Sequence, residues 1–248
     1  MTELALYREP TVLEAANHRH LKLLPMADLS VTERMHASYL AAVEFAQAAR
    51  EFVIVFVRRA DAAGKPEVSS VVLLGVTPGE NLFVNGSQWD ASYIPAYIRR
   101  YPFWTILLES SSTSALMFDA WWRGFSQTVG EALFVAEGRP APMLVETLQF
   151  VCNFETGSVR TQAFCARLVE LDLLRAMRAD LTLPDGSTLT LNDFLTIDED
   201  KLQALSDATV IEAHRNGMLG LIHAHLLSLA NIRPLVERKV RRKPAAAA

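Results

Sequence analysis

The sequence predicts an α+β protein, with an antiparallel β-meander in the N-terminal half and a mainly helical C-terminal half that contains one late hairpin. Short β-branched runs separated by loops with Gly and Pro occupy the region before residue 120, for example FVIVFVRR and SSVVLLGV. After Pro140 and Pro142 the apolar residues recur at helical spacing instead. Half of the 248 residues are hydrophobic and 21% are charged, which indicates a folded chain with a sizeable core.

The N-terminal region combines irregular chain, one helix and a first pair of strands. Residues 1–30 are expected to be irregular apart from a short strand at 20–24. The alanine-rich stretch 32–49 has apolar residues at helical spacing, which predicts a helix. The runs 52–58 and 69–76, joined by a loop with Gly and Pro, are expected to form an antiparallel pair. The second run is almost continuously apolar, so both of its faces are expected to be buried.

Turn signals divide the middle of the chain. The sequence Thr-Pro-Gly-Glu at 77–80 is typical of a tight turn. Asn85-Gly86 supplies the positive φ angles of a type I′ hairpin turn. The segment 94–100 is either one helical turn or extended, since Pro95 suits the first turn of a helix. The remaining strands of this half are expected at 81–89, 105–109 and 115–119.

The C-terminal half is predicted to be mainly helical. Gly157 is expected to end one helix, and Asp185-Gly186 to form the turn of the late hairpin. Another short strand is expected at 194–197. The predicted helices span 143–156, 159–177, 199–204, 207–215 and 218–232. Helix caps are expected at Ser158, Asp198 and Ser206.

A single domain over residues 1–248 is expected, with an irregular start at 1–20 and a basic, alanine-rich tail at 237–248. The first residues include acids where a secretory signal has bases, and they form no continuous apolar stretch. The apolar stretch 218–232 is shorter than the roughly 18–20 residues that span a bilayer. We therefore expect no transmembrane segment and a cytoplasmic location.

Cysteine and charge content add two further expectations. The two cysteines, Cys152 and Cys165, are expected to be free thiols, although a helical hairpin could bring them together. The net charge is −4, while residues 233–243 carry six basic side chains and a single acid. A mildly acidic protein with a short basic tail does not resemble a nucleic-acid-binding surface. The tail is expected to be solvated and frayed, or else to touch an acidic partner or anionic lipid.

Histidines and short motifs give no catalytic site. His223 and His225 are two residues apart in a predicted helix and cannot share one metal ion, so both are expected to face the core. His18 and His20 would share a face of a strand, but no third ligand lies at local spacing. The sequence contains no G-x-S-x-G, no P-loop and no G-x-G-x-x-G motif. We expect no metal and no cofactor, and we assign no catalytic residue.

The densest unusual stretch is WDASYIPAYIRRYPFW at 89–104. Its candidate binding residues are Trp89, Tyr93, Tyr97, Arg99, Arg100, Tyr101 and Trp104. Aromatic and arginine side chains dominate the energetics of protein interfaces, so this stretch could be a binding surface. Alternatively, the rings cover a sheet edge and the arginines pair with surface acids. Trp121 and Trp122 are adjacent, so one of them is expected to be exposed or under a loop.

Several of these segments together resemble the bacterial SapC family. The resemblance rests on FVIVFV, LLGVTPGENLFVNGSQWDASYIPAYIRRYPF, GEALF and HRNGMLGLIHAHLLSLANIRPLV, and it covers residues 21–236. The stretch 109–128 is less typical of the family, so the Trp121–Trp122 pair has no support from it. The family is associated with surface-layer export, and its members tend to be encoded beside TonB-dependent receptors and flavin-dependent halogenase-like proteins. The resemblance supplies no catalytic residue.

These observations favour a non-catalytic accessory protein that binds another protein of a surface-layer export or outer-membrane uptake system. The partner would be one of the proteins associated with the family, and the contact would lie at 89–104. The alternative is an enzyme that modifies a peptide or small molecule with an unidentified metal or organic cofactor. A third possibility is a structural component that associates with itself.

Overall fold

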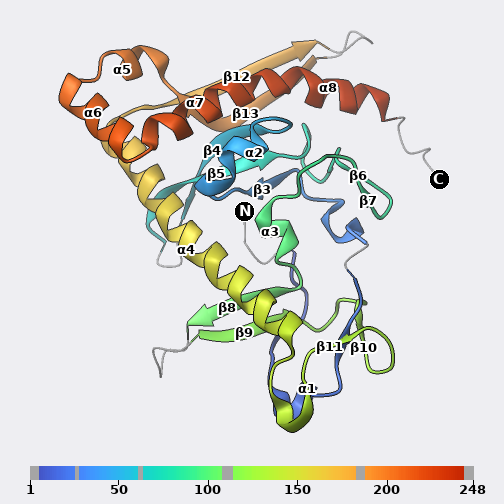
Figure 1. Cartoon of the computed structure of the whole chain (residues 1–248). Coiled ribbons are helices and arrows are strands. Elements are labelled where there is room, and N and C mark those ends of the chain that lie inside the picture. The colour runs from blue at the N-terminus through green and yellow to red at the C-terminus, as the bar shows by residue number, and fades with distance from the viewer. Residues whose placement is uncertain (1–5, 26–27, 61–63, 108–113, 183–187, 243–248) are drawn as a thin grey trace.

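A computed structural model describes residues 6–25, 28–60, 64–107, 114–182 and 188–242 of the chain (Figure 1). The α+β prediction is confirmed, because antiparallel strands predominate in the N-terminal half and helices in the C-terminal half. The late hairpin is also present, although its predicted turn at Asp185-Gly186 lies outside the described residues.

The elements are short apart from one long helix and two long hairpins. The strands are β1 (Pro10–Val12), β2 (Lys22–Leu23), β3 (Ala37–Tyr39), β4 (Val53–Ala60), β5 (Pro66–Leu73), β6 (Val84–Asn85), β7 (Gln88–Trp89), β8 (Phe103–Leu107), β9 (Ser114–Asp119), β10 (Phe125–Ser126), β11 (Glu131–Ala132), β12 (Leu174–Thr182) and β13 (Thr188–Ile197). The α-helices are α1 (Ala15–His18), α2 (Phe45–Ala48), α3 (Ala96–Arg99), α4 (Pro142–Glu170), α5 (Glu199–Gln203), α6 (Asp207–Arg215), α7 (Met218–Ser228) and α8 (Ile232–Arg241). Short 3-10 helices are η2 (Ser30–Thr32), η3 (Ala42–Glu44), η4 (Ala136–Gly138) and η5 (Leu229–Asn231).

The largest sheet has the strand order β12-β13-β4-β5-β3, with antiparallel neighbours throughout. The expected pairing of 52–58 with 69–76 is confirmed by β4 and β5, which pair from Val53–Leu73 to Ala60–Pro66. The late hairpin joins the same sheet where Leu195 of β13 lies opposite Phe56 of β4. The late hairpin therefore extends the sheet that the antiparallel strands of the N-terminal half begin.

Both faces of this sheet are covered, which explains its continuous apolar strands. Residues 53–56 and 71–74 are buried in every position. Helix α4 lies against β5, while α7 lies against β4 and β13 (Figure 1). We call the buried residues around this sheet the main core; its largest fully buried side chains include Phe45, Phe52 and Phe56. Burying each of these rings stabilises the fold by about 2–3 kcal/mol.

The other strands form three small sheets with the orders β1-β9-β8, β10-β2-β11 and β6-β7. A separate buried cluster joins the first two of these sheets to the N-terminal half of α4. It consists of Phe103, Phe118, Leu133, Leu144 and Val151. Helix α4 therefore runs from the main core at one end to the small sheets at the other (Figure 1).

A buried histidine fastens α7 to the central sheet. His225 is fully buried, and its Nδ1 lies 2.9 Å from the Ile54 carbonyl oxygen. Its Nε2 accepts a hydrogen bond from the Ile197 backbone N–H at 3.2 Å, so the proton of the neutral ring sits on Nδ1. Burial lowers the pKa of His225 to about 4. The expectation of a core-facing side chain is confirmed for His225 and wrong for His223, which is exposed.

The predicted helix over 32–49 is wrong. The segment instead contains η2, the edge strand β3, η3 and the single turn α2. The strand forms because the segment lies along β5: the Leu40 N–H donates to the Ser70 carbonyl oxygen, and the Ser70 hydroxyl donates to the Leu40 carbonyl oxygen. Pairing with an existing sheet outweighs the helix propensity of the alanines.

The predicted break at Gly157 is also wrong, because α4 continues through it without interruption. A Cβ atom at this position would lie 3.8 Å from Ala41 Cβ, so the glycine lies where η3 approaches the helix closely. A glycine inside a helix costs only about 1 kcal/mol, which the buried face of α4 offsets. Ser158 accepts a hydrogen bond from the Tyr39 hydroxyl at 3.0 Å instead of capping a new helix. Strand β12 occupies the end of the second predicted helix.

The turn between β6 and β7 differs in detail from the prediction. Asn85 pairs with Gln88, so the two turn residues are Gly86 and Ser87. Only Gly86 has a positive φ, at 60°. A positive φ at the first turn position alone is typical of a type II′ turn, so the predicted type I′ turn is wrong.

The basic tail is helical and packs against the protein as far as Arg242, so the expected frayed end is wrong for this part. Arg238 forms an ion pair with Asp90 at 2.6 Å, and Lys239 forms one with Glu80 at 2.5 Å. Arg242 donates hydrogen bonds to two backbone carbonyls in and just before β6. Contact of the tail with an acidic partner or lipid stays a prediction.

Helices α7, η5 and α8 form a continuous stretch, Met218–Arg241, that is long and apolar enough to cross a membrane by length and composition alone. Within it Ile222, His225 and Ser228 are fully buried against the rest of the protein. A helix packed on a protein core meets the same criterion, so this stretch is weak evidence for a membrane span. The expectation of no transmembrane segment stays a prediction.

Candidate binding surface

The loop before α3 is held in place by two carboxylates of the preceding helical segment. Glu44 is buried, and its Oε1 accepts hydrogen bonds from the Tyr93 hydroxyl at 2.6 Å and the Ala96 N–H at 2.7 Å. Burial and the carboxylate of Glu44 raise the pKa of Tyr93. Glu51 accepts hydrogen bonds from the N–H and hydroxyl of Ser92 and from the Tyr93 N–H. Burial alone would raise the pKa of Glu51, but these hydrogen bonds outweigh it and lower the pKa.

The middle of the stretch 89–104 is buried in a second, smaller cluster. We call this the aromatic cluster; it consists of Leu6, Tyr7, Ala96, Tyr97, Tyr101 and Phe154. Around its rim lie the partly buried side chains of Val31, Met35, Tyr39, Trp104, Trp122 and Phe150. Of the candidate residues, Tyr97 and Tyr101 belong to this cluster and Trp104 to its rim.

Arg100 is buried beside the aromatic cluster and is 7% exposed. Its guanidinium carbon lies 4.7 Å from the ring centre of Tyr97 and 4.4 Å from that of Phe154. Its Nη1 forms an ion pair with Glu155 of α4 at 2.7 Å. Within the described residues its Nε has no hydrogen-bond partner, so this buried charge is only partly compensated.

A fully buried carboxylate closes the aromatic cluster on the other side. Asp119 accepts hydrogen bonds from the Tyr101 hydroxyl at 2.8 Å and the Glu9 N–H at 2.8 Å, and also from the N–H groups of Arg8 and Trp121 at 3.2 Å. Burial and this carboxylate raise the pKa of Tyr101. Through these hydrogen bonds the N-terminal segment packs against the aromatic cluster, although the two are far apart in the sequence.

Two arginines remain at the surface and stack on aromatic rings. Arg99 is exposed, and its guanidinium carbon lies 5.1 Å from the ring centre of Phe150 and 5.5 Å from that of Tyr93. Arg8 is exposed and lies 3.7 Å from the ring centre of Trp121, which is 42% exposed. We call these two groups the arginine–aromatic patches.

The other tryptophans have structural contacts. Trp89 is partly buried against the main core, and its Nε1 donates a hydrogen bond to the Tyr93 carbonyl oxygen at 2.8 Å. The ring of Trp104 lies 4.2 Å from that of Tyr7. Trp122 packs edge-on against Tyr101 and is partly buried, so the expectation that one residue of the tryptophan pair is exposed is confirmed by Trp121.

The structure therefore separates the seven candidate residues. Tyr97, Arg100 and Tyr101 are buried and cannot meet a partner without rearrangement. Arg99 is exposed, and Trp89, Tyr93 and Trp104 are partly exposed. The sequence analysis missed Tyr7, Arg8, Phe150 and Phe154, because nothing in the local pattern relates them to the stretch 89–104.

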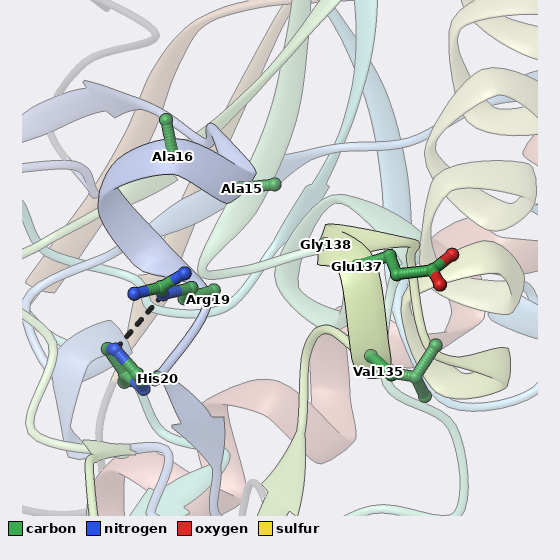
Figure 2. A pocket seen from close by; sticks show the side chains of 8 residues that line it. Ala15, Ala16, Arg19, His20, Val135, Glu137 and Gly138 are labelled. Atoms are coloured by element: carbon green, nitrogen blue, oxygen red, sulfur yellow. Dashed lines mark hydrogen bonds between the residues drawn. The ribbon is translucent and has the colours of Figure 1, made fainter.

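A hollow of about 550 Å³ lies between α1 and η4 (Figure 2). In Figure 2, Arg19 and His20 lie on one side of it, and Glu137 and Val135 on the other. The Arg19 Nε donates a hydrogen bond to the His20 Nε2 at 3.2 Å. Glu137 has a positive φ of 64°, an unfavourable conformation for a residue other than glycine. The hollow is open to the surface, and its polar side chains are exposed.

Histidine and cysteine side chains do not gather into a site. His18 is partly buried with its ring edge-on to Phe118, whereas His20 points into the hollow. Among the described residues no three metal-binding side chains come together, and the expectation of no metal stays a prediction. The two cysteines are unpaired: Cys152 is exposed, and burial raises the pKa of Cys165 to about 12.

The sequence profile of the SapC family matches residues 13–235, which is most of the chain. The chain belongs to the SapC family. No curated protein and no solved structure is significantly similar to it. The SapC match includes the aromatic cluster apart from its first two members, and it includes Arg99, Phe150 and Trp121. Tyr7 and Arg8 precede the match, so this SapC protein completes the surface with residues outside the family profile.

Proposed function

We propose that this SapC-family protein is a non-catalytic binding protein that acts through protein–protein contacts in a surface-layer export or outer-membrane uptake system. The observation that supports the proposal is the pair of arginine–aromatic patches beside the aromatic cluster. The stretch 89–104 contributes Arg99 and Tyr93 to one of them. A cytoplasmic location and a partner encoded near SapC genes belong to the same proposal.

The patches suit binding because their side chains are already ordered. The Arg99 Nε donates a hydrogen bond to the Ile94 carbonyl oxygen at 2.9 Å, which holds the guanidinium over Phe150. A side chain that is fixed before binding loses less conformational entropy when a partner docks. A guanidinium is weakly hydrated and presents several donors, so a stacked arginine can bind an acidic or carbonyl-rich surface.

The first test replaces Arg99 with glutamate. Protein isolated from its own host by a mild procedure is expected to retain a second polypeptide, which Arg99→Glu should lose at least about tenfold. Arg175→Glu is the matched control, since Arg175 is also exposed but lies on β12. Circular dichroism should show that both variants keep the fold. Equal retention by Arg99→Glu and the control would contradict the proposed contact.

Tyr97 and Arg100 are unsuitable for this test because both are buried. Their substitution would disturb packing as well as binding. Trp121→Ala provides a second surface variant, because the ring is 42% exposed and stacks on Arg8. We expect it to weaken retention of the partner without unfolding the protein.

The alternative function is an enzyme that modifies a peptide or small molecule. The hollow between α1 and η4, with Arg19, His20 and Glu137, is the feature that would favour it. Native mass spectrometry of protein from its own host distinguishes the two functions. A stoichiometric mass excess of a metal or organic cofactor would support the enzyme, whereas a bare chain with a second polypeptide would support the binding protein.

A further inference from the structure

Helix α4 has an unusually apolar outer face. It runs for 29 residues, and one side packs on both the main core and the aromatic cluster. On the outer side Val145 and Val159 are 54% and 67% exposed, and Leu148 is 39% exposed. A surface helix of a soluble protein normally carries charged and polar residues on this side. Here the valines and the leucine alternate with uncharged residues, and an exposed helix face with apolar residues and few charges is typical of an interface.

The outer residues follow the spacing of a helix-pairing seam. Their separations alternate between four and three residues, and every one is exposed: Val145, Gln149, Cys152, Thr156, Val159 and Ala163. This 3.5-residue repeat is the spacing that keeps one face of a helix against a second helix over several turns. The opposite side, with Val151, Phe154 and Thr161, is buried in the protein. The seam therefore has no partner within the described residues.

The charges beside the seam match an antiparallel copy of the same helix. Glu146 and Arg160 flank it, both are exposed, and neither forms an ion pair within the described residues. They have opposite charges and lie two heptads apart, so a two-fold axis midway between them brings each next to the other. Glu155, which lies near this axis, already pairs with Arg100 of its own chain.

We infer that the protein forms a two-fold symmetric dimer in which α4 pairs with α4 of a second copy in antiparallel orientation. The axis lies at the level of residues 153 and 154. Across this axis Val145 lies opposite Ala163 of the second copy, and Cys152 lies opposite Thr156 of the second copy. Glu146 and Arg160 of the two copies form two equivalent ion pairs. This inference is independent of the proposed partner.

The segment of α4 that pairs with the second copy, residues 145–163, ends before the C-terminal turns of the helix. Arg167 is bound there to Glu170 and to Glu212 of α6, so α6 lies beside this end of the helix. If the two helices were paired along a longer segment, Glu146 of the second copy would lie next to Arg167. Arg167 already has two acidic partners, Glu170 and Glu212, so a third acid there would be unfavourable. The shorter overlap instead pairs Glu146 with the uncompensated charge of Arg160. Val169 is 52% exposed but lies beyond the shared segment, on the same side of α4 as Val151.

Analytical ultracentrifugation of the purified full chain tests the dimer. A dimer of twice 27.5 kDa is expected at micromolar concentration. Val159→Arg should raise the dimer dissociation constant at least about tenfold, because it places two cations in the seam, each opposite Gln149 of the other copy. Val169→Arg is the matched control and should leave the constant unchanged. A monomer at all concentrations, or equal effects of the two variants, would overturn the inference.

Charge reversal tests the antiparallel orientation. Glu146→Arg and Arg160→Glu should each weaken the dimer roughly three- to tenfold, because each creates two like-charge pairs. The double variant should restore the dimer to near its original strength. Failure of this restoration would overturn the antiparallel arrangement, even if a dimer is present.

Cross-linking tests the register. In Thr156→Cys the new thiol lies opposite Cys152 of the second copy, so mild oxidation should give a covalent dimer on a non-reducing gel. Ala163→Cys should not give that product, because Ala163 lies opposite Val145. Cross-linking of Ala163→Cys but not of Thr156→Cys would overturn the register.

Discussion

The main core and the aromatic cluster are stabilised in different ways. Around the central sheet the side chains are mostly aliphatic or Phe, and the one buried histidine is neutral and fully hydrogen-bonded. Beside the aromatic cluster lie Arg100, whose Nε has no hydrogen-bond partner among the described residues, and the carboxylate of Asp119. Apolar burial contributes stability directly, whereas buried charges bring a desolvation cost that their partners only offset. The main core is therefore expected to contribute more to the free energy of unfolding than the aromatic cluster.

The largest expected effect is the loss of a main-core ring. Phe56→Ala should lower the free energy of unfolding by about 3–5 kcal/mol, because the ring is fully buried and a cavity would remain. Phe150→Ala, at the partly buried rim of the aromatic cluster, should cost about 1 kcal/mol. Denaturant unfolding followed by circular dichroism measures both. If the two variants lost similar amounts of unfolding free energy, the main core would not contribute more to stability than the aromatic cluster.

An intermediate effect is expected on acidification, through His225. The unfolded side chain has a pKa near 6.5, and the folded one has a pKa of about 4. The unfolded chain therefore binds a proton that the folded protein excludes, so stability falls as the pH falls from about 6.5 to about 4. The expected loss is up to about 3 kcal/mol.

The contribution of His225 can be separated from that of the carboxylates. Glu51 and Glu80 have lowered pKa values and titrate below the ordinary value of 4.5, so unfolding should be measured between pH 4.5 and 6.5. Burial also lowers the pKa of His36, so His225→Gln should remove the larger part of the pH dependence in this window and not all of it. His223→Gln, at an exposed position, should retain the full dependence. An unchanged slope in His225→Gln would show that another group is responsible.

The smallest effect is expected for the charge beside the aromatic cluster. Arg100→Met should change the free energy of unfolding by less than about 1 kcal/mol, since it removes an unpartnered buried N–H and keeps the packing against Tyr97 and Phe154. Glu155, which loses its ion pair with Arg100, is 43% exposed and can be hydrated. Thermal unfolding measures the change. A loss above about 2 kcal/mol would mean that the ion pair, and not ring packing, holds the cluster together.

Local sequence patterns predict the central strands well and the helix boundaries less well. The β-branched runs of β4 and β5 have only one favourable environment, a sheet that is covered on both sides. The helices that begin after Asp198 and Ser206 could be predicted because Asp and Ser are favoured N-cap residues. In the structure both side chains accept a hydrogen bond from the first turn of the helix. The continuity of α4 through Gly157 depends on tertiary packing that no local pattern contains.

The candidate surface was predictable only in part. A dense aromatic and arginine stretch draws attention to Arg99 and Arg100, but local spacing does not show that one is exposed and the other buried. That difference arises from α4, whose Phe150 supports Arg99 and whose Glu155 pairs with Arg100. The stacking of Arg8 on Trp121 joins residues more than a hundred positions apart. Contacts between residues so far apart cannot be inferred from local sequence patterns.

The N-terminal segment has a practical consequence for anyone who prepares this protein. The backbone N–H groups of Arg8 and Glu9 bind the buried carboxylate of Asp119, although both residues precede the SapC match. A recombinant version trimmed to residue 13 would leave that carboxylate with two fewer donors and uncover Tyr101. An affinity tag fused close to Leu6 would crowd the same place. Versions that differ only in their first dozen residues can therefore differ in solubility and in what they bind.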